Sequence, residues 1–93
     1  MDDAAAIKDI ADRQIKEMKA AGKLKYPVRG IKVEFGTDST GDPAAWIWIV
    51  VDDDLDPSRE KVLQLNRLTD AVRDALLERS TDPWPYVGLR AAA

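Results

Sequence analysis

The 93-residue chain contains no cysteine and no histidine. The absence of cysteine excludes disulfide bonds, thiolate catalysis and cysteine-ligated zinc. The absence of histidine removes imidazole as a catalytic base and as the commonest ligand of transition metals. We therefore predict a protein without a cofactor and without a metal centre of the usual kind.

Long apolar runs are missing as well. The most prominent, Trp46 to Val51, has six residues, whereas a helix that crosses a bilayer needs roughly 20. The first ten residues, MDDAAAIKDI, are acidic where a secretory signal is basic. With no internal repeat, these features predict a single cytoplasmic domain, residues 1–93, that does not enter a membrane.

Charge is distributed unevenly along the chain. Residues 31–56 hold one basic side chain against seven acidic ones, a net charge of −6 where the whole chain carries −3. This acidity disfavours nucleic-acid binding through the middle of the chain.

Apolar residues recur at helical spacing over 3–21 and 57–79, and both segments are predicted to be helices. Gly22 is predicted to end the first helix. Asp56 and Pro57 are predicted to begin the second, as its N-cap and first helical residue. A helix over 57–79 would be about 34 Å long and would overhang or break above six-residue strands of about 20 Å.

Three strands are predicted, over 28–36, 46–51 and 84–90, with a loop over 36–45 between the first two. Pro85 favours an edge position for the third strand. The order α-β-β-α-β and the small sheet predict an α+β fold, a two-layer sandwich in which both helices cover one face of a three-stranded mixed sheet. The covered face is predicted to hold Ile31, Val33, Phe35, Ile47, Ile49, Val51, Val87 and Leu89.

The opposite face of the predicted sheet would carry an unusual set of apolar side chains. Strand alternation places these residues there: Trp46, Trp48, Val50, Trp84 and Tyr86. A large apolar patch of this kind generally marks an interface, and tryptophan and tyrosine dominate binding hot spots. In the alternative interpretation, the tryptophans pack within the monomer on the stems of Lys32 and Arg29.

Carboxylates lie on both sides of the second predicted strand. Asp38 and Asp42, in the preceding loop, are predicted to extend the protein-binding surface beside the tryptophans. After the strand, Asp52 and Asp54 offer oxygen ligands suited to Mg²⁺, but such a run is also typical of a solvated turn before a helix. The sequence leaves open whether this second acidic run binds a cation.

The loop carries a more specific pattern, Gly-x-Asp-Ser-x-Gly-Asp-Pro-Ala-x-Trp. Its residues here are Gly36, Asp38, Ser39, Gly41, Asp42, Pro43, Ala44 and Trp46. The segment resembles one found in small bacterial proteins that look like companions of toxin–antitoxin genes, beside HEPN-domain ribonucleases. The resemblance implies a small partner-binding protein and no catalytic residue.

The element order is also similar to the KH-like fold of the ribosome-binding factor A family. That resemblance implies an RNA-binding role, although the Gly-x-x-Gly clamp of KH domains has no counterpart between residues 57 and 83. The side chains available for such a role are Lys16, Lys19, Lys23 and Lys25.

Taken together, the sequence predicts a non-enzymatic, antitoxin-like module that binds a protein partner through its aromatic sheet face. A homodimer formed through the same face and a KH-like RNA-binding factor are the alternatives. The sequence predicts no small-molecule substrate.

Overall fold

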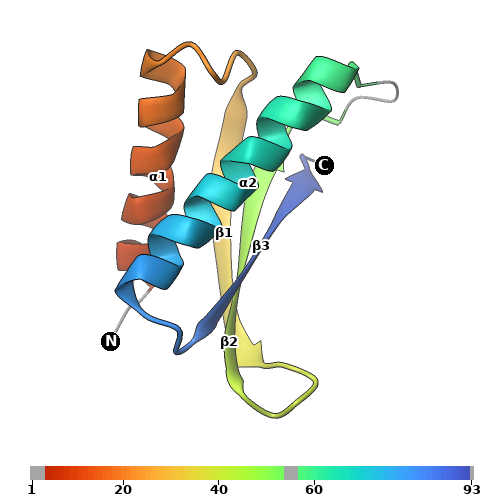
Figure 1. The fold of residues 1–93 in the computed structure, drawn as a ribbon. Helices are drawn as coiled ribbons and strands as arrows, with labels where there is room; N and C mark the ends of the chain where they lie inside the picture. Colours follow the sequence, from red (N-terminus) through yellow and green to blue (C-terminus); the bar gives the residue numbers. More distant parts are fainter. Residues whose placement is uncertain (1–3, 54–56, 93) are drawn as a thin grey trace.

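The computed structural model describes residues 4–53 and 57–92 (Figure 1). The elements follow the order α1 (Ala4–Ala20), β1 (Val28–Thr37), β2 (Pro43–Val51), α2 (Arg59–Arg79) and β3 (Trp84–Ala91). The predicted α+β class and the order α-β-β-α-β are thus confirmed.

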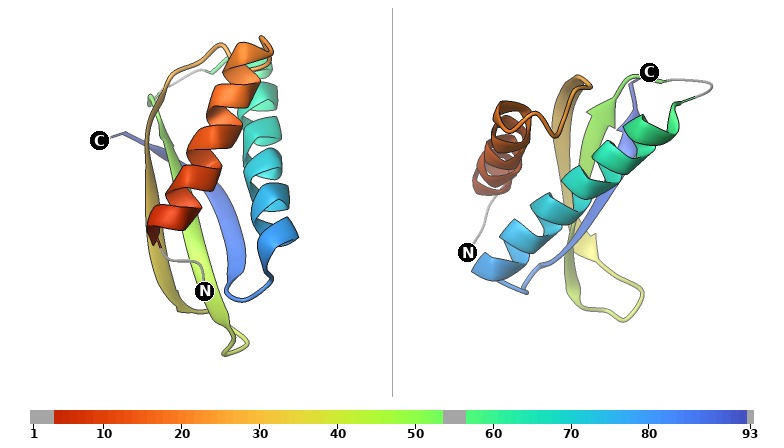
Figure 2. Two further views of the ribbon diagram at one scale, coloured as in Figure 1. Left: turned by 90° about the vertical axis from the view of Figure 1, so that its left-hand side faces the viewer. Right: turned by 45° about the horizontal axis from the view of Figure 1, so that its top comes forward.

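The three strands form one mixed sheet in the order β1-β2-β3. The β1 and β2 strands pair antiparallel, whereas β2 and β3 pair parallel. The parallel pairing arises because α2 returns the chain to the end of the sheet at which β2 begins. Both helices lie on the same face of the sheet, as predicted, and no helix of the described residues covers the other face (Figure 2). With β3 at an edge, Pro85 lies where a missing N–H donor costs least.

The core lies between the helices and one face of β2. Ile47 and Ile49 of β2 and Leu68 and Val72 of α2 have the largest side chains that are almost completely buried. From α1, the core takes Ile7, Ile10, Ala11 and Ile15. From Ala45 to Val51 the odd-numbered residues of β2 are buried and therefore point towards the helices, as the alternation predicted.

The end of α1 follows the glycine prediction. Gly22 has φ +72°, its N–H donates to the carbonyl of Lys19, and the N–H of Lys23 donates to the carbonyl of Met18. This pair of bonds is the Schellman motif, which satisfies carbonyl groups that the helix end leaves unpaired.

The start of α2 differs from the prediction. The helix begins at Arg59 rather than at Pro57, and the side chain of Ser58 caps it by accepting a hydrogen bond from the N–H of Lys61. The predicted cap, Asp56, lies outside the described residues. Serine and aspartate cap helices by the same bond, and the prediction considered only the aspartate.

The strands are longer than predicted. The second begins at Pro43 instead of Trp46, so only residues 38–42 remain between β1 and β2. Nine residues of β2 span about 30 Å, close to the length of about 32 Å for the 21 residues of α2. The helix therefore runs unbroken along the sheet.

Two residues predicted on the covered face are exposed. Phe35 is 51% exposed and Leu89 is 37% exposed. The hairpin of β1 and β2 projects past the ends of both helices, and Phe35 lies near its tip (Figure 1). Leu89 lies on the edge strand β3, beside a groove against α2 that Val62 and Leu65 also line. Neither helix among the described residues is long and apolar enough to cross a membrane.

Candidate functional site

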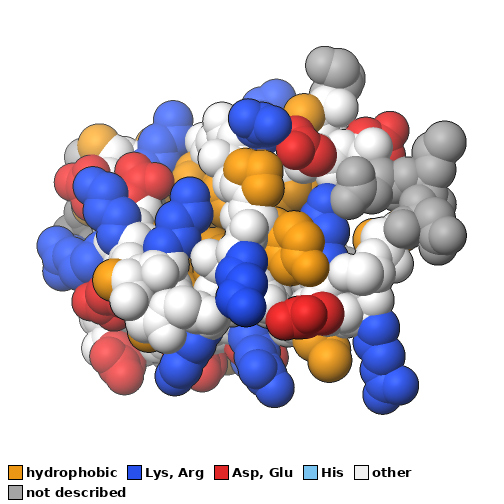
Figure 3. Space-filling view, turned by 90° about the horizontal axis from the view of Figure 1, so that it is seen from above, with side chains coloured by type: hydrophobic (Ala, Val, Ile, Leu, Met, Phe, Trp, Pro, Cys, Tyr) orange, Lys and Arg blue, Asp and Glu red, His pale blue; other side chains and the backbone are white. Residues whose placement is uncertain are grey.

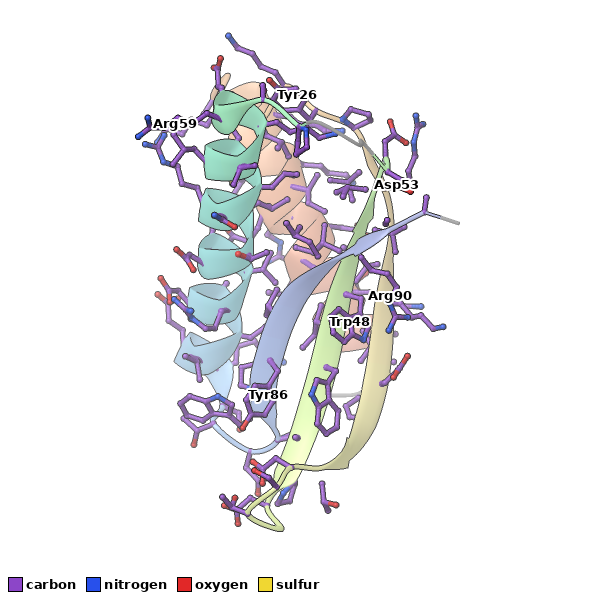
Figure 4. All side chains as sticks on the ribbon, turned by 90° about the vertical axis from the view of Figure 1, so that its right-hand side faces the viewer. Tyr26, Trp48, Asp53, Arg59, Tyr86 and Arg90 are labelled. Carbon is purple, nitrogen blue, oxygen red and sulfur yellow. The ribbon has the colours of Figure 1, made fainter. Side chains whose placement is uncertain are left out.

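The uncovered face of the sheet holds the predicted aromatic residues. Trp46, Trp48 and Val50 alternate with the buried residues of β2 and are each partly exposed. Trp84 and Tyr86 extend this row onto β3, and each is 41% exposed. The register pairs Trp46 with Tyr86, and Figure 4 shows Trp48 and Arg90 on the side of the sheet away from the helices. These side chains form a continuous surface, which we call the open face.

The middle of the open face is covered by the protein's own side chains. The guanidinium of Arg90 lies over the ring of Trp48 at 4.6 Å from its centroid, and Arg90 Nη1 is 3.7 Å from Glu34 Oε1. The indole leans on Gly88, where a Cβ atom would be only 2.9 Å from Trp48 Cζ3. The indole Nε1 is buried and has no hydrogen-bond partner among the described residues.

Trp48 therefore packs within the monomer, and of the two side chains predicted for that role, Lys32 is its partner on β1. Arg90 covers the indole, whereas Arg29 donates two hydrogen bonds to Asp52, at 2.6 and 3.0 Å. Sequence reasoning missed Arg90, Gly88 and Glu34 as parts of this surface. A glycine inside a strand does signal a close approach by another group, and Gly88 was that signal.

Trp46 is held nearer the hairpin end. Its ring stacks on Tyr86, with centroids 5.8 Å apart and planes inclined by 17°. It also lies against Gly36, whose missing side chain makes room for it, since a Cβ there would be 3.1 Å from Trp46 Cζ3. Offset stacking of this kind favours a fixed ring position.

The turn between β1 and β2 is organised by Asp38. Its Oδ1 accepts hydrogen bonds from the N–H and the hydroxyl of Thr40 and from the N–H of Asp42. Gly41 has φ +85°, a conformation that glycine adopts without strain. Most residues of the Gly-x-Asp-Ser-x-Gly-Asp-Pro-Ala-x-Trp segment thus have a structural role in shaping the hairpin and seating Trp46.

A long-range hydrogen bond joins the turn to the open face. The hydroxyl of Tyr86 donates to Asp38 Oδ2 at 3.1 Å. The hydroxyl of Thr40, with further hydrogen bonds from Asp42, Thr40 and Tyr86, lowers the pKa of Asp38, so this carboxylate stays ionised. The same bond and the nearby charges of Asp38 and Asp42 raise the pKa of Tyr86 above its ordinary value of 10.0.

This pair gives a prediction for alkaline pH. A phenol whose pKa is raised on folding stabilises the folded state below its ordinary pKa, and that contribution is lost as the pH rises through the folded value. In a Tyr26→Phe background, where Tyr86 is the only tyrosine, Asp38→Asn should make the phenol ionise at lower pH because the neighbouring charge is gone. Ultraviolet absorbance of the phenolate measures this, and an unchanged midpoint would contradict the assigned bond.

The cation interpretation of the second acidic run receives no support. Asp52 is paired with Arg29, and this hydrogen-bonded pairing lowers the pKa of Asp52. Asp54 lies outside the described residues. Within residues 4–53 and 57–92, no group of three acidic, histidine or cysteine side chains is placed to hold a metal ion.

The lysines considered for RNA binding lie at the opposite end of the molecule from the hairpin tip. All four, Lys16, Lys19, Lys23 and Lys25, are exposed. Figure 3, which looks onto the end where α1 finishes and α2 begins, shows acidic side chains among the basic ones. Such mixed charge does not make the continuous basic surface that backbone phosphates require.

No protein-family model matches the chain, and comparison with curated proteins and with solved structures gives no match. The likeness to the ribosome-binding factor A family therefore stays one of element order. The structure itself brings Trp46, Trp84, Tyr86, Asp38 and Asp42 together at one end of the open face, with Trp48 and Val50 further along it.

Proposed function

We propose that the protein is a non-enzymatic binding module that holds a protein partner on its open face. The observation that carries this proposal is the exposure of Trp84 and Tyr86, at 41% each, beside the stacked ring of Trp46. Large, rigid aromatic side chains left half-exposed on a flat sheet are the anchors that protein interfaces use most.

The position of the anchors differs from the simplest expectation. Arg90 already covers Trp48, so we assign the centre of binding to the hairpin end, at Trp46, Trp84 and Tyr86. Trp48 supports that surface from the side by fixing the middle of the sheet.

The partner is proposed to be basic. Asp38 and Asp42 lie at the hairpin end of the open face, in the most acidic part of the chain. Electrostatic complementarity of this kind speeds association and rejects partners of the wrong charge. An acidic module that masks an RNA-binding toxin fits this chemistry, and the resemblance of the hairpin segment supports an antitoxin-like role in the bacterial cytoplasm.

A second copy of the chain is the alternative partner. Lys32 lies opposite Trp48 on the open face, away from the acidic hairpin. Two open faces packed with their strands antiparallel would bring the basic part of one copy near the acidic end of the other. A C₂ dimer of this kind is the commonest oligomer.

Site-specific photo-crosslinking tests the proposed face. We expect p-benzoylphenylalanine placed at Lys32, on the open face, to form a covalent adduct with another protein in cells. The same residue placed at Arg67, on the exposed side of α2, is the matched control and should form none.

The mass of the adduct separates the candidates. An adduct of twice the chain's mass supports the homodimer, and an adduct removed by ribonuclease supports the RNA-binding alternative. Equal crosslinking from both positions, or from neither, would overturn the assignment of the open face as the binding surface.

A further inference from the structure

A cleft of about 320 Å³ lies at the hairpin end of the open face. The residues that line it are Asp38, Asp42, Pro43, Thr81, Asp82, Trp84 and Tyr86. Its two sides are far apart in sequence, but they meet because β2 and β3 run parallel and begin next to each other, with Ala44 paired to Trp84. The turn before β2 and the segment before β3 thus form opposite walls.

The walls combine two kinds of surface. Trp84 and Tyr86 present aromatic rings that are 41% exposed, and Asp38, Asp42 and Asp82 present carboxylates. No lysine or arginine is among the lining residues. Aromatic faces and carboxylates attract the same class of ligand, a cation with a flat or apolar outline.

Elsewhere on the open face, the protein combines an indole and a carboxylate with a cation of its own. In the middle of the open face, Arg90 stacks over Trp48 at 4.6 Å and pairs with Glu34 at 3.7 Å. The cleft offers an exposed indole and carboxylates without a cation of its own among its lining residues.

We propose that this cleft recognises a guanidinium group, the side chain of an arginine on the bound protein. The inference rests on the proposed function, because it assigns the chemistry of the partner. Guanidinium is favoured over ammonium because it is planar, stacks on aromatic rings and forms paired hydrogen bonds with carboxylates. The lowered pKa of Asp38 keeps a negative charge in the cleft at neutral pH.

The test uses a small compound, so it does not depend on finding the partner. N-acetyl-arginine amide is titrated into the isotopically labelled full chain and followed by NMR, with N-acetyl-citrulline amide as an uncharged control of the same shape. We expect saturable shifts of the Trp84 indole and Tyr86 amide signals with the arginine compound, with a Kd on the order of millimolar. The citrulline compound should produce none.

Two variants locate the binding. Trp84→Ala and Asp82→Asn should each weaken it about fivefold or more, since one removes the stacking surface and the other a charge. Asp74→Asn, an equal change of charge on the exposed side of α2, is the matched control and should leave the Kd unchanged.

Several results would overturn the inference. Equal shifts with the citrulline compound would show that charge is not the basis of recognition. Equal affinity for N-acetyl-lysine amide would show that guanidinium is not preferred over ammonium. Shifts centred away from the cleft, or the absence of shifts, would remove the site. The crosslinking experiment tests for a protein partner, whereas the titration tests the cleft. If the arginine compound binds but no adduct forms, the cleft still recognises guanidinium and the proposal of a protein partner is wrong.

Discussion

Truncating Ile49 to alanine should lower the free energy of unfolding by about 3 kcal/mol, whereas Val50→Ala should lower it by less than about 1 kcal/mol. The two residues are neighbours on β2, but Ile49 is fully buried against the helices and Val50 lies half-buried on the open face. Chemical denaturation of each variant at a single temperature measures the difference.

The adjacent pair is its own control, because both variants lose apolar groups from the same strand. Similar losses for Ile49→Ala and Val50→Ala would mean that both faces of β2 are equally covered. The open face would then not exist as a surface for a partner.

The fold was predictable because its signals are local. Alternation in the strands and helical spacing over α1 and α2 determine which side chains can share a face, and three strands cannot bury both faces with two helices. Gly22 ended α1 as predicted because no other residue adopts its conformation as easily. The start of α2 was predicted two residues too early, because aspartate and serine cap a helix by the same bond and the local pattern around Asp56 also fits a helix start.

Only part of the candidate site could be predicted from the sequence. The aromatic residues of the open face follow from alternation within each strand. The contribution of Asp82 and Thr81 to the cleft does not, because it requires β3 to lie parallel to β2 with a known register. Nor could local patterns show that Arg90 reaches across to Trp48, since that contact joins two strands separated by a helix.

The coverage of Trp48 divides the open face into two parts with different roles. In the middle, Arg90 of the same chain already covers the indole of Trp48, and this packing adds rigidity to the sheet. The hairpin end, where Trp84 and Tyr86 stay half-exposed, has aromatic surface that nothing among the described residues covers fully. A partner therefore gains more from the hairpin end, where it removes apolar surface from water without first displacing Arg90.

Replacing Gly88 by valine should test this division with the largest effect on the open face. A Cβ at this position would be 2.9 Å from Trp48 Cζ3, so the ring must move, and in moving it loses the contact with Arg90. We expect the free energy of unfolding to fall by about 2 kcal/mol, a typical result of overpacking. Gly30→Ala is the matched control, because nothing lies within 4 Å of a Cβ built there.

A double-mutant cycle assigns the cause. In a Trp48→Ala background the valine at position 88 has no ring to displace, and valine favours strands more than glycine does. Gly88→Val should therefore be neutral or slightly stabilising there, which gives a coupling energy of about 2 kcal/mol between the two positions. If the valine costs the same with and without the indole, its cost comes from the backbone of β3. Trp48 would then not be held by the close approach to Gly88 that separates it from the binding end of the open face.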